Sequence, residues 1–67
     1  MMTYDRNRNA ITTGSSVMIN GTGKTGTIKA IKADGMTPGQ VRRSKTVEID
    51  GCDGQFEPIE LIRLGMH

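Results

Sequence analysis

The chain of 67 residues has few of the residues on which disulfide-rich domains and many enzyme sites depend: one cysteine, one histidine, no tryptophan and two aromatic side chains. Because Cys52 is alone, no disulfide framework can form within one chain, and with His67 as the sole histidine no metal site is expected. No apolar run approaches the ~20 residues of a membrane span, and residues 1–10 lack the apolar core of a signal peptide. We therefore expect a cytoplasmic protein with no cofactor, no small-molecule substrate and no membrane contact.

The length limits the chain to one small domain, since a domain of about 60 residues buries only ~60% of its extended-chain surface. Residues 1–12 are polar and without period, and Tyr4 is their one large apolar side chain. They predict a flexible or loosely docked arm. Arg6 and Arg8 within it could touch a phosphate backbone, although a plain disordered tail is the alternative. Residues 13–65 are predicted to form the single folded domain.

Residues 23–25, Gly-Lys-Thr, resemble the end of a phosphate-binding loop. That motif needs a glycine five positions before its second glycine, where this chain has Met18. It must also open a helix, whereas residues 26–31 begin with glycine and are rich in β-branched side chains, which favour a strand. The segment therefore predicts two strands and the turn between them, and no nucleotide site.

The net charge of +2 hides an uneven distribution. Residues 1–45 carry eight basic side chains against two acidic ones, a net of +6, and residues 46–67 carry one against five, a net of −4. Such a split suggests polyanion binding. The alternative is a dipolar surface whose charges serve solubility and pair across strands.

Period-two alternation predicts five short strands, at residues 16–20, 27–32, 46–50, 55–57 and 62–64. In the second of these, Ile31 falls on the face opposite Ile28, which indicates a bulge, a bend or burial on both sides. Thr37 followed by Pro38 is typical of a helix start, so the long loop 33–45 is expected to hold one helical turn, Pro38–Arg42, with Val41 pointing inward. Pro58 should end the fourth strand and start a 3₁₀ turn.

These elements predict an all-β protein, a small five-stranded antiparallel barrel whose closure removes exposed strand edges. The margins of the core are expected at Ile31, Val41 and Ile62. The predicted core itself consists of Val17, Ile19, Ile28, Ala30, Val47, Ile49, Phe56, Ile59, Leu61 and Leu64.

The spacing Gly14-x-x-Val17-x-Ile19-x-Gly21, followed by Gly26-x-Ile28-x-x-Ile31, resembles the KOW motif of SH3-like barrels. That motif occurs in ribosomal large-subunit proteins and transcription elongation factors. Residues 47–64 are similar to the closing half of many SH3-like barrels, including small photosystem subunits. The resemblance implies a binding module for RNA or for a protein of the gene-expression machinery, with the turn at residues 20–25 as part of its site.

The function expected from these observations is a non-enzymatic module that binds RNA or DNA through a basic patch. Lysine and arginine bind phosphate oxygens through charge-assisted hydrogen bonds, and binding of this kind is salt-dependent. With so few aromatic side chains, base stacking should contribute little. The predicted nucleic-acid-binding residues are Lys24, Lys29, Lys32, Arg42, Arg43 and Lys45.

Two other functions are weighed against this one. A protein–protein adaptor or small inhibitor would dock through the Met36–Val41 loop or the acidic C-terminal half, although packing of Met36 and Val41 against the barrel is favoured over a partner contact. An enzyme is not expected. Glu57 and Glu60 fit a solvated acidic rim better than a catalytic pair, and no basic residue lies near Cys52 in the sequence to activate its thiol.

Overall fold

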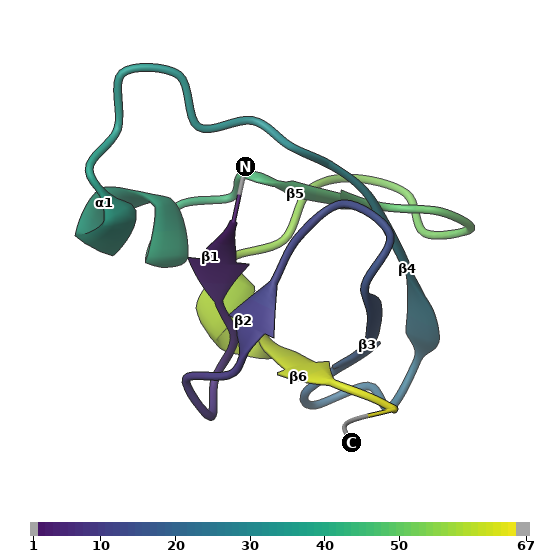
Figure 1. Cartoon of the computed structure of the whole chain (residues 1–67). Coiled ribbons are helices and arrows are strands. Elements are labelled where there is room, and N and C mark those ends of the chain that lie inside the picture. Colours follow the sequence, from purple (N-terminus) through teal and green to yellow (C-terminus); the bar gives the residue numbers. More distant parts are fainter. Residues whose placement is uncertain (1, 66–67) are drawn as a thin grey trace.

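A four-stranded antiparallel sheet in the order β5-β4-β3-β6 forms the centre of the molecule (Figure 1). The structure is a computed structural model and describes residues 2–65. The strands of this sheet are β3 (Ser16–Ile19), β4 (Thr25–Ile31), β5 (Val47–Ile49) and β6 (Leu61–Arg63). A second, two-stranded antiparallel sheet pairs β1 (Thr3–Tyr4) with β2 (Ala10–Ile11). The predicted all-β class is confirmed.

The turn between β3 and β4 has the geometry that its glycines allow. Gly21 and Gly23 have φ values of 101° and 75°, in the region that L-residues rarely occupy. Gly26 lies within β4, where a Cβ atom would come 2.5 Å from Cγ2 of Ile49 on the neighbouring strand. Because a strand and no helix follows the turn, the structure confirms that residues 23–25 do not belong to a nucleotide-binding loop.

β4 contains the irregularity that its side-chain pattern indicates. Its register against β5 shifts between Ile28 and Ala30, so that Ile28 pairs with Ile49 while Ile31 pairs with Val47. The shift is a β-bulge, which lets an even-numbered and an odd-numbered residue of the same strand both point toward the core. Ile28 is buried, and Ile31 packs against the same core while half-buried.

The long connection from β4 to β5 holds the short helix α1 (Pro38–Arg42), with the bounds that the sequence predicts. Thr37 caps it, because its Oγ1 accepts a hydrogen bond from the Gln40 amide at 3.3 Å and Gln40 Oε1 accepts one from the Thr37 amide at 2.9 Å. Val41 is fully buried and anchors the helix, as expected. The 3₁₀ turn η1 (Pro58–Glu60) precedes β6, also as predicted.

The core contains most of the aliphatic residues that the strand pattern marks. Ile11 and Ala33 are buried although the sequence did not place them in the core. Ala30, Phe56, Ile59 and Leu64, expected in the core, are half-buried. The buried cluster consists of Ile11, Val17, Ile19, Ile28, Val47, Ile49 and Leu61.

The structure differs from the expected fold in three respects. The strand pairing of the described residues leaves the sheet open, and the strand expected at residues 55–57 is reduced to an isolated bridge between Phe56 and Val47. Pro58 limits that segment, because it has no amide hydrogen to extend the ladder. The expected flexible arm, residues 1–12, instead contains the β1–β2 hairpin and supplies Ile11 to the core, so the folded unit begins before residue 13.

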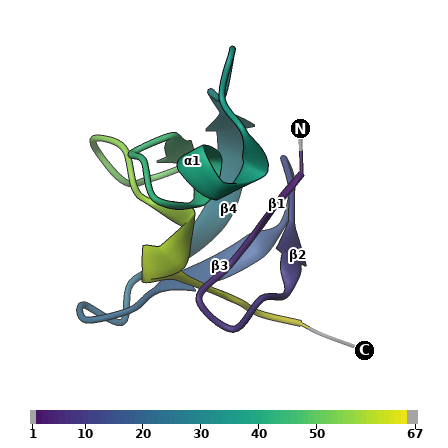
Figure 2. The same ribbon diagram turned by 90° about the vertical axis from the view of Figure 1, so that its left-hand side faces the viewer.

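The β1–β2 hairpin is attached to β6 and to α1. The Arg6 amide donates to the Leu61 carbonyl at 2.8 Å, and the Arg63 guanidinium donates to the Ala10 carbonyl at 3.0 Å. Figures 1 and 2 show α1 beside β1, and α1 also contacts η1. Residues 2–65 contain no helix long and apolar enough to cross a bilayer.

Candidate nucleic-acid interface

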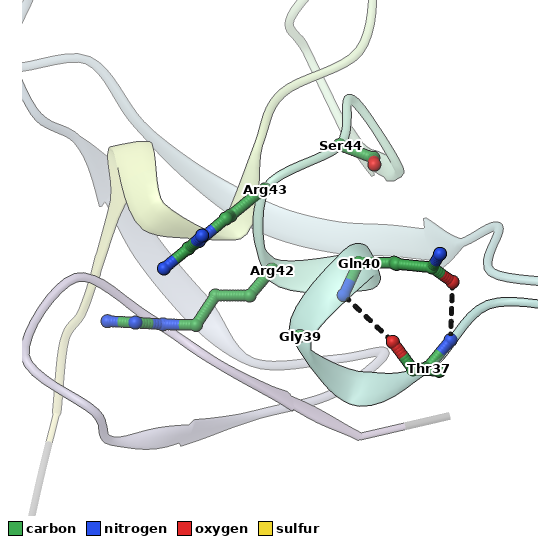
Figure 3. Close-up of a pocket in the computed structure, with 6 residues that line it drawn as sticks. All are labelled: Thr37, Gly39, Gln40, Arg42, Arg43 and Ser44. Atoms are coloured by element: carbon green, nitrogen blue, oxygen red, sulfur yellow. Dashed lines mark hydrogen bonds between the residues drawn. The ribbon is translucent and has the colours of Figure 1, made fainter.

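Two of the six predicted basic residues, Arg42 and Arg43, lie together at the end of α1. Both line one open hollow of about 570 Å³, together with Thr37, Gly39, Gln40 and Ser44. Figure 3 shows the two guanidinium groups extending from the helix in the same direction. Among residues 2–65 no acidic side chain lines this hollow, so the positive charge there is not neutralised from within it.

Arg42 has a fixed position because its guanidinium holds the N-terminal hairpin. Its Nη2 donates to the Asp5 carbonyl at 3.1 Å and to the Arg6 carbonyl at 3.4 Å. Its Nε is buried and has no hydrogen-bond partner among the described residues. Arg42 therefore contributes to the fold as well as to the charge of the surface, whereas the Arg43 side chain is exposed.

A second hollow, of about 250 Å³, adjoins the first through Arg42. Its lining residues are Tyr4, Arg8 and Arg42. Tyr4 is 42% exposed because Thr3, its neighbour in β1, takes the inward position, leaving Tyr4 on the outer face. We refer to Tyr4, Arg8, Arg42 and Arg43 as the arginine surface.

Asp5 builds the turn that presents Arg8. Its carboxylate is completely buried, and its Oδ1 accepts hydrogen bonds from the backbone N–H groups of Asn7 and Asn9, both at 2.8 Å. Its Oδ2 accepts a bond from the Arg63 amide at 2.6 Å, which fastens the turn to β6. Arg8 itself has a φ of 63°, a left-handed conformation that the closed turn imposes. Asp5 thus fixes the turn that contains Arg8 through its carboxylate, and it holds the Arg42 guanidinium through its backbone carbonyl.

The other four predicted residues do not join this surface. Lys32 pairs with Glu48 at 3.5 Å, and Lys45 lies 4.0 Å from Glu60, both as exposed ion pairs. Such pairs contribute little, typically ~0–1 kcal/mol. Lys29 is exposed on β4. Lys24 belongs to the turn between β3 and β4, and this turn lies away from α1 in both views (Figures 1 and 2). The predicted patch is therefore divided, and part of the charge asymmetry is used in pairing between the two halves of the chain.

Cys52 lies in a third hollow, of about 280 Å³, whose lining includes Lys24, Asp53 and Phe56. The thiol is half-buried against the core. Although no basic residue is near Cys52 in the sequence, the fold brings the β3–β4 turn with Lys24 to the same hollow. Within residues 2–65 there is no group of three or more His, Cys, Asp or Glu side chains that could hold a metal ion.

The residues that the alternative functions would use are partly committed to the fold. Val41 is buried, whereas Met36 is 38% exposed. Glu60, in the acidic half, accepts a hydrogen bond from the Glu57 amide at 2.9 Å, which closes the η1 turn. Glu57 and Glu60 are thus linked by a capping interaction within η1.

Tyr4 was not among the predicted site residues, and Arg8 was considered only as part of a flexible arm, because the N-terminal segment has no clear strand period. The sequence nevertheless contains a signal for a hairpin in this segment. Asp5, Asn7 and Asn9 form a run of side chains that stabilise tight turns, and apolar or β-branched residues flank it at 3–4 and 10–11. That combination is typical of a hairpin.

Together the fold and the site define a small all-β protein with guanidinium groups gathered around one exposed tyrosine. The chain belongs to the YdfZ protein family, whose sequence profile matches residues 2–65. It is 60% identical to "Putative selenoprotein YdfZ" of Escherichia coli strain K12 over 67 residues, covering 100% of both chains. The proteins of the same name from Escherichia coli O6:H1 and Shigella flexneri match with the same identity and coverage. No solved structure matches the chain.

The family match corrects the resemblance to KOW-motif and SH3-like domains. The profile that covers almost the whole chain is that of YdfZ, and no KOW or SH3 family matches. The resemblance depended on glycines at strand ends and on alternating aliphatic residues. Any small antiparallel sheet with tight turns requires both, so the pattern does not distinguish one family from another.

Proposed function

We propose that this chain is a cytoplasmic, non-enzymatic module that binds RNA or DNA through the arginine surface. The observation that carries the proposal is that Arg8 and Arg42, from two distant segments, line one hollow with the exposed Tyr4, while Arg42 and Arg43 line the adjoining hollow. No acidic side chain of the described residues lines either hollow. Guanidinium groups bind phosphate oxygens in a bidentate geometry, and they also stack on aromatic rings. The arrangement therefore suits a phosphate backbone better than a single small anion.

The position of Arg42 supports this proposal further. Its hydrogen bonds to the Asp5 and Arg6 carbonyls hold it in place before any ligand arrives, so little side-chain freedom is lost on binding. The turn that Asp5 closes fixes the backbone of Arg8, while the Arg8 side chain itself is exposed. A surface of three guanidinium groups is nevertheless small. We expect an affinity in the range of non-specific binding, with Kd of ~10⁻⁴–10⁻⁶ M at physiological salt.

The test is the binding of a fluorescein-labelled single-stranded oligothymidylate, followed by anisotropy as the salt concentration is raised. Three phosphate contacts predict a slope of log K against log salt of about −2, or roughly a 20-fold loss between ~50 and ~200 mM salt. Arg43→Glu should weaken binding several-fold and reduce the slope by at least about 0.7. Arg43 is chosen because it is exposed and forms no side-chain hydrogen bond to the hairpin, unlike Arg42.

The matched control is Lys24→Glu, which makes the same change in net charge on the turn away from α1. It should leave the affinity nearly unchanged. Equal losses for the two variants would show that only net charge matters, and binding insensitive to salt would contradict the proposal. If nuclease-treated extracts of the host yielded one stoichiometric protein partner, the adaptor alternative would be supported instead.

The finer description of the fold, a small five-stranded barrel, also stays a proposal. The Phe56 bridge lies beside β5, and η1 leads directly into β6 at the other edge of the sheet. This order is compatible with a strongly curled sheet in which residues 55–57 form the fifth strand. Cross-strand NOEs running along residues 55–57 in solution would support it, and contacts confined to Phe56 would contradict it.

A second candidate function arises from the hollow that contains Cys52. The matching relatives carry the name selenoprotein, and Cys52 is the only thiol of this chain. We propose that, if this chain carries selenium, Cys52 is the attachment site, since its half-buried sulfur shares a hollow with the Lys24 ammonium. Elemental analysis of protein produced with selenite should then show selenium in the wild type and none in Cys52→Ser. Equal selenium in both would refute this assignment.

A further inference from the structure

We propose that the hollow at Tyr4 is a subsite for one unpaired nucleobase, so that the arginine surface prefers single-stranded over duplex nucleic acid. This inference rests on the function proposed above and specifies the form of its ligand. The sequence argued against base stacking, because the chain has only two aromatic side chains. The structure places one of them, Tyr4, on the surface among the arginines, where it is available for stacking.

The ring of Tyr4 has little to cover it on its own sheet. Tyr4 pairs across the hairpin with Ala10, and side chains directly opposite each other in an antiparallel pair lie on the same face. The neighbouring strand thus contributes only a methyl group beside the ring. An exposed aromatic ring with a small cross-strand neighbour provides a flat apolar face on which a base can stack, a contact worth ~1–3 kcal/mol by alanine substitution.

The hollow at Tyr4 is a small, open depression of the surface. At about 250 Å³ it is smaller than the ~300–1,000 Å³ that pockets for drug-sized ligands occupy. It suits a single ring system better than a whole dinucleotide or cofactor. Since a base within a duplex already stacks on its neighbours, only an unpaired or extruded base can place its face on Tyr4.

Of the two adjoining hollows, the one at Tyr4 would bind the base, and the one at Arg43 would bind the phosphate of the nucleic acid. Arg42 lines both of them, and Arg43 lines the one beyond. A base on Tyr4 would lie between the guanidinium groups of Arg8 and Arg42, and the adjacent phosphate would meet Arg42 and Arg43. Stacking tolerates every base, because each has a π-face, so this site should show little sequence preference.

The experiment compares two single-stranded ligands of equal length, an oligothymidylate and an abasic strand with the same number of phosphates, in low salt. Wild-type protein should bind the base-bearing strand about fivefold or more tightly than the abasic strand. Tyr4→Ala should abolish that difference while still binding both strands. Tyr4→Phe, which keeps the ring, should restore it. Because Tyr4 is the only tyrosine, a chain labelled with 3-fluorotyrosine reports on this hollow through one ¹⁹F resonance, which should shift with the base-bearing strand alone.

The possible results separate this inference from the proposed function. If wild-type protein binds both strands equally and the ¹⁹F resonance does not move, the base subsite is refuted while phosphate binding stands. Tighter binding to a duplex of the same sequence would also refute it. If neither strand binds in low salt, the proposed function fails, and the inference fails with it. Circular dichroism of each Tyr4 variant checks that a loss of binding is not a loss of folding.

Discussion

Replacing Asp5 by alanine tests the link between the N-terminal hairpin and the rest of the fold. The Asp5 carboxylate is completely buried and accepts three backbone hydrogen bonds, two within its own turn and one from Arg63 in β6. Alanine leaves all three amide donors without that partner. The variant should lose stability, and the hairpin should detach from β6 before the central sheet unfolds.

The magnitude depends on which donors water can reach. An unsatisfied buried donor costs ~1–3 kcal/mol, and this applies best to the Arg63 amide, whose bond to Asp5 Oδ2 is 2.6 Å long. The Asn7 and Asn9 amides lie on an outer turn where water can replace the carboxylate, so each loss should be nearer the ~0.5–1.5 kcal/mol of an ordinary hydrogen bond. Because the substitution also removes a buried charge, part of this lost stability is recovered. The expected net decrease in the free energy of unfolding is therefore about 2–4 kcal/mol. In a domain of this size that corresponds to a fall in Tm of roughly 10–25 °C.

The assay is urea denaturation followed by far-ultraviolet circular dichroism, with a thermal melt for Tm. Asp34→Ala is the control, since it removes the same charge from an exposed loop residue, and it should change the free energy of unfolding by less than about 0.5 kcal/mol. Asp5→Asn should fall between the two, because it keeps one acceptor oxygen and places an NH₂ group against the remaining donors. A loss below about 1 kcal/mol for Asp5→Ala would refute the role assigned to this carboxylate.

Three further substitutions test the local geometry by the same denaturation assay. Gly26→Ala should destabilise the fold by ~1–3 kcal/mol, because its Cβ would lie 2.5 Å from Cγ2 of Ile49, and an unchanged stability would contradict the close packing of β4 on β5. Gly39→Ala should instead stabilise by ~0.5–1 kcal/mol, since its Cβ meets nothing within 4 Å and alanine favours the helix; a loss would argue against α1. Thr37→Ala removes the side-chain acceptor of the Gln40 backbone N–H and should lower the free energy of unfolding by ~0.5–2 kcal/mol. An unchanged stability would contradict the helix cap.

Much of the central sheet could be predicted because its physical signals are local. Val17 and Ile19 recur at every second position between Ser16, Met18 and Asn20, Val47 and Ile49 flank Glu48 in the same way, and both pairs are buried in the strands expected. Thr37 and Pro38 determine the start of α1 through capping and a fixed φ, which are also local effects. Pro58 likewise sets the end of one segment and the start of η1.

The N-terminal hairpin could not be predicted in the same way, because its strands have only two residues each. A strand of two residues is too short to show an alternation of apolar and polar side chains. The contacts that hold the hairpin in place come from residues far away in the sequence. The Asp5 carboxylate bonds to Arg63, and the Arg42 guanidinium bonds to the Asp5 carbonyl. Such contacts between residues far apart in the chain leave no pattern in one sequence.

The same limit explains the partial success at the site. Counting basic residues identified Arg42 and Arg43 but could not show that Lys24 lies on a turn away from them, or that Lys32 pairs with Glu48. Tyr4 and Arg8 entered the surface only through the hairpin. The exposed aromatic ring among the arginines was therefore beyond what composition could indicate.

The measurement that tests the central claim most directly is a titration of the ¹⁵N-labelled protein with a single-stranded oligothymidylate in low salt, followed by the backbone amide shifts. The account predicts saturable shifts concentrated at residues 4–8 and 39–44, the two segments that carry the arginine surface. Shifts concentrated instead at residues 21–25 and 51–56, or no shifts at all at millimolar ligand, would contradict it.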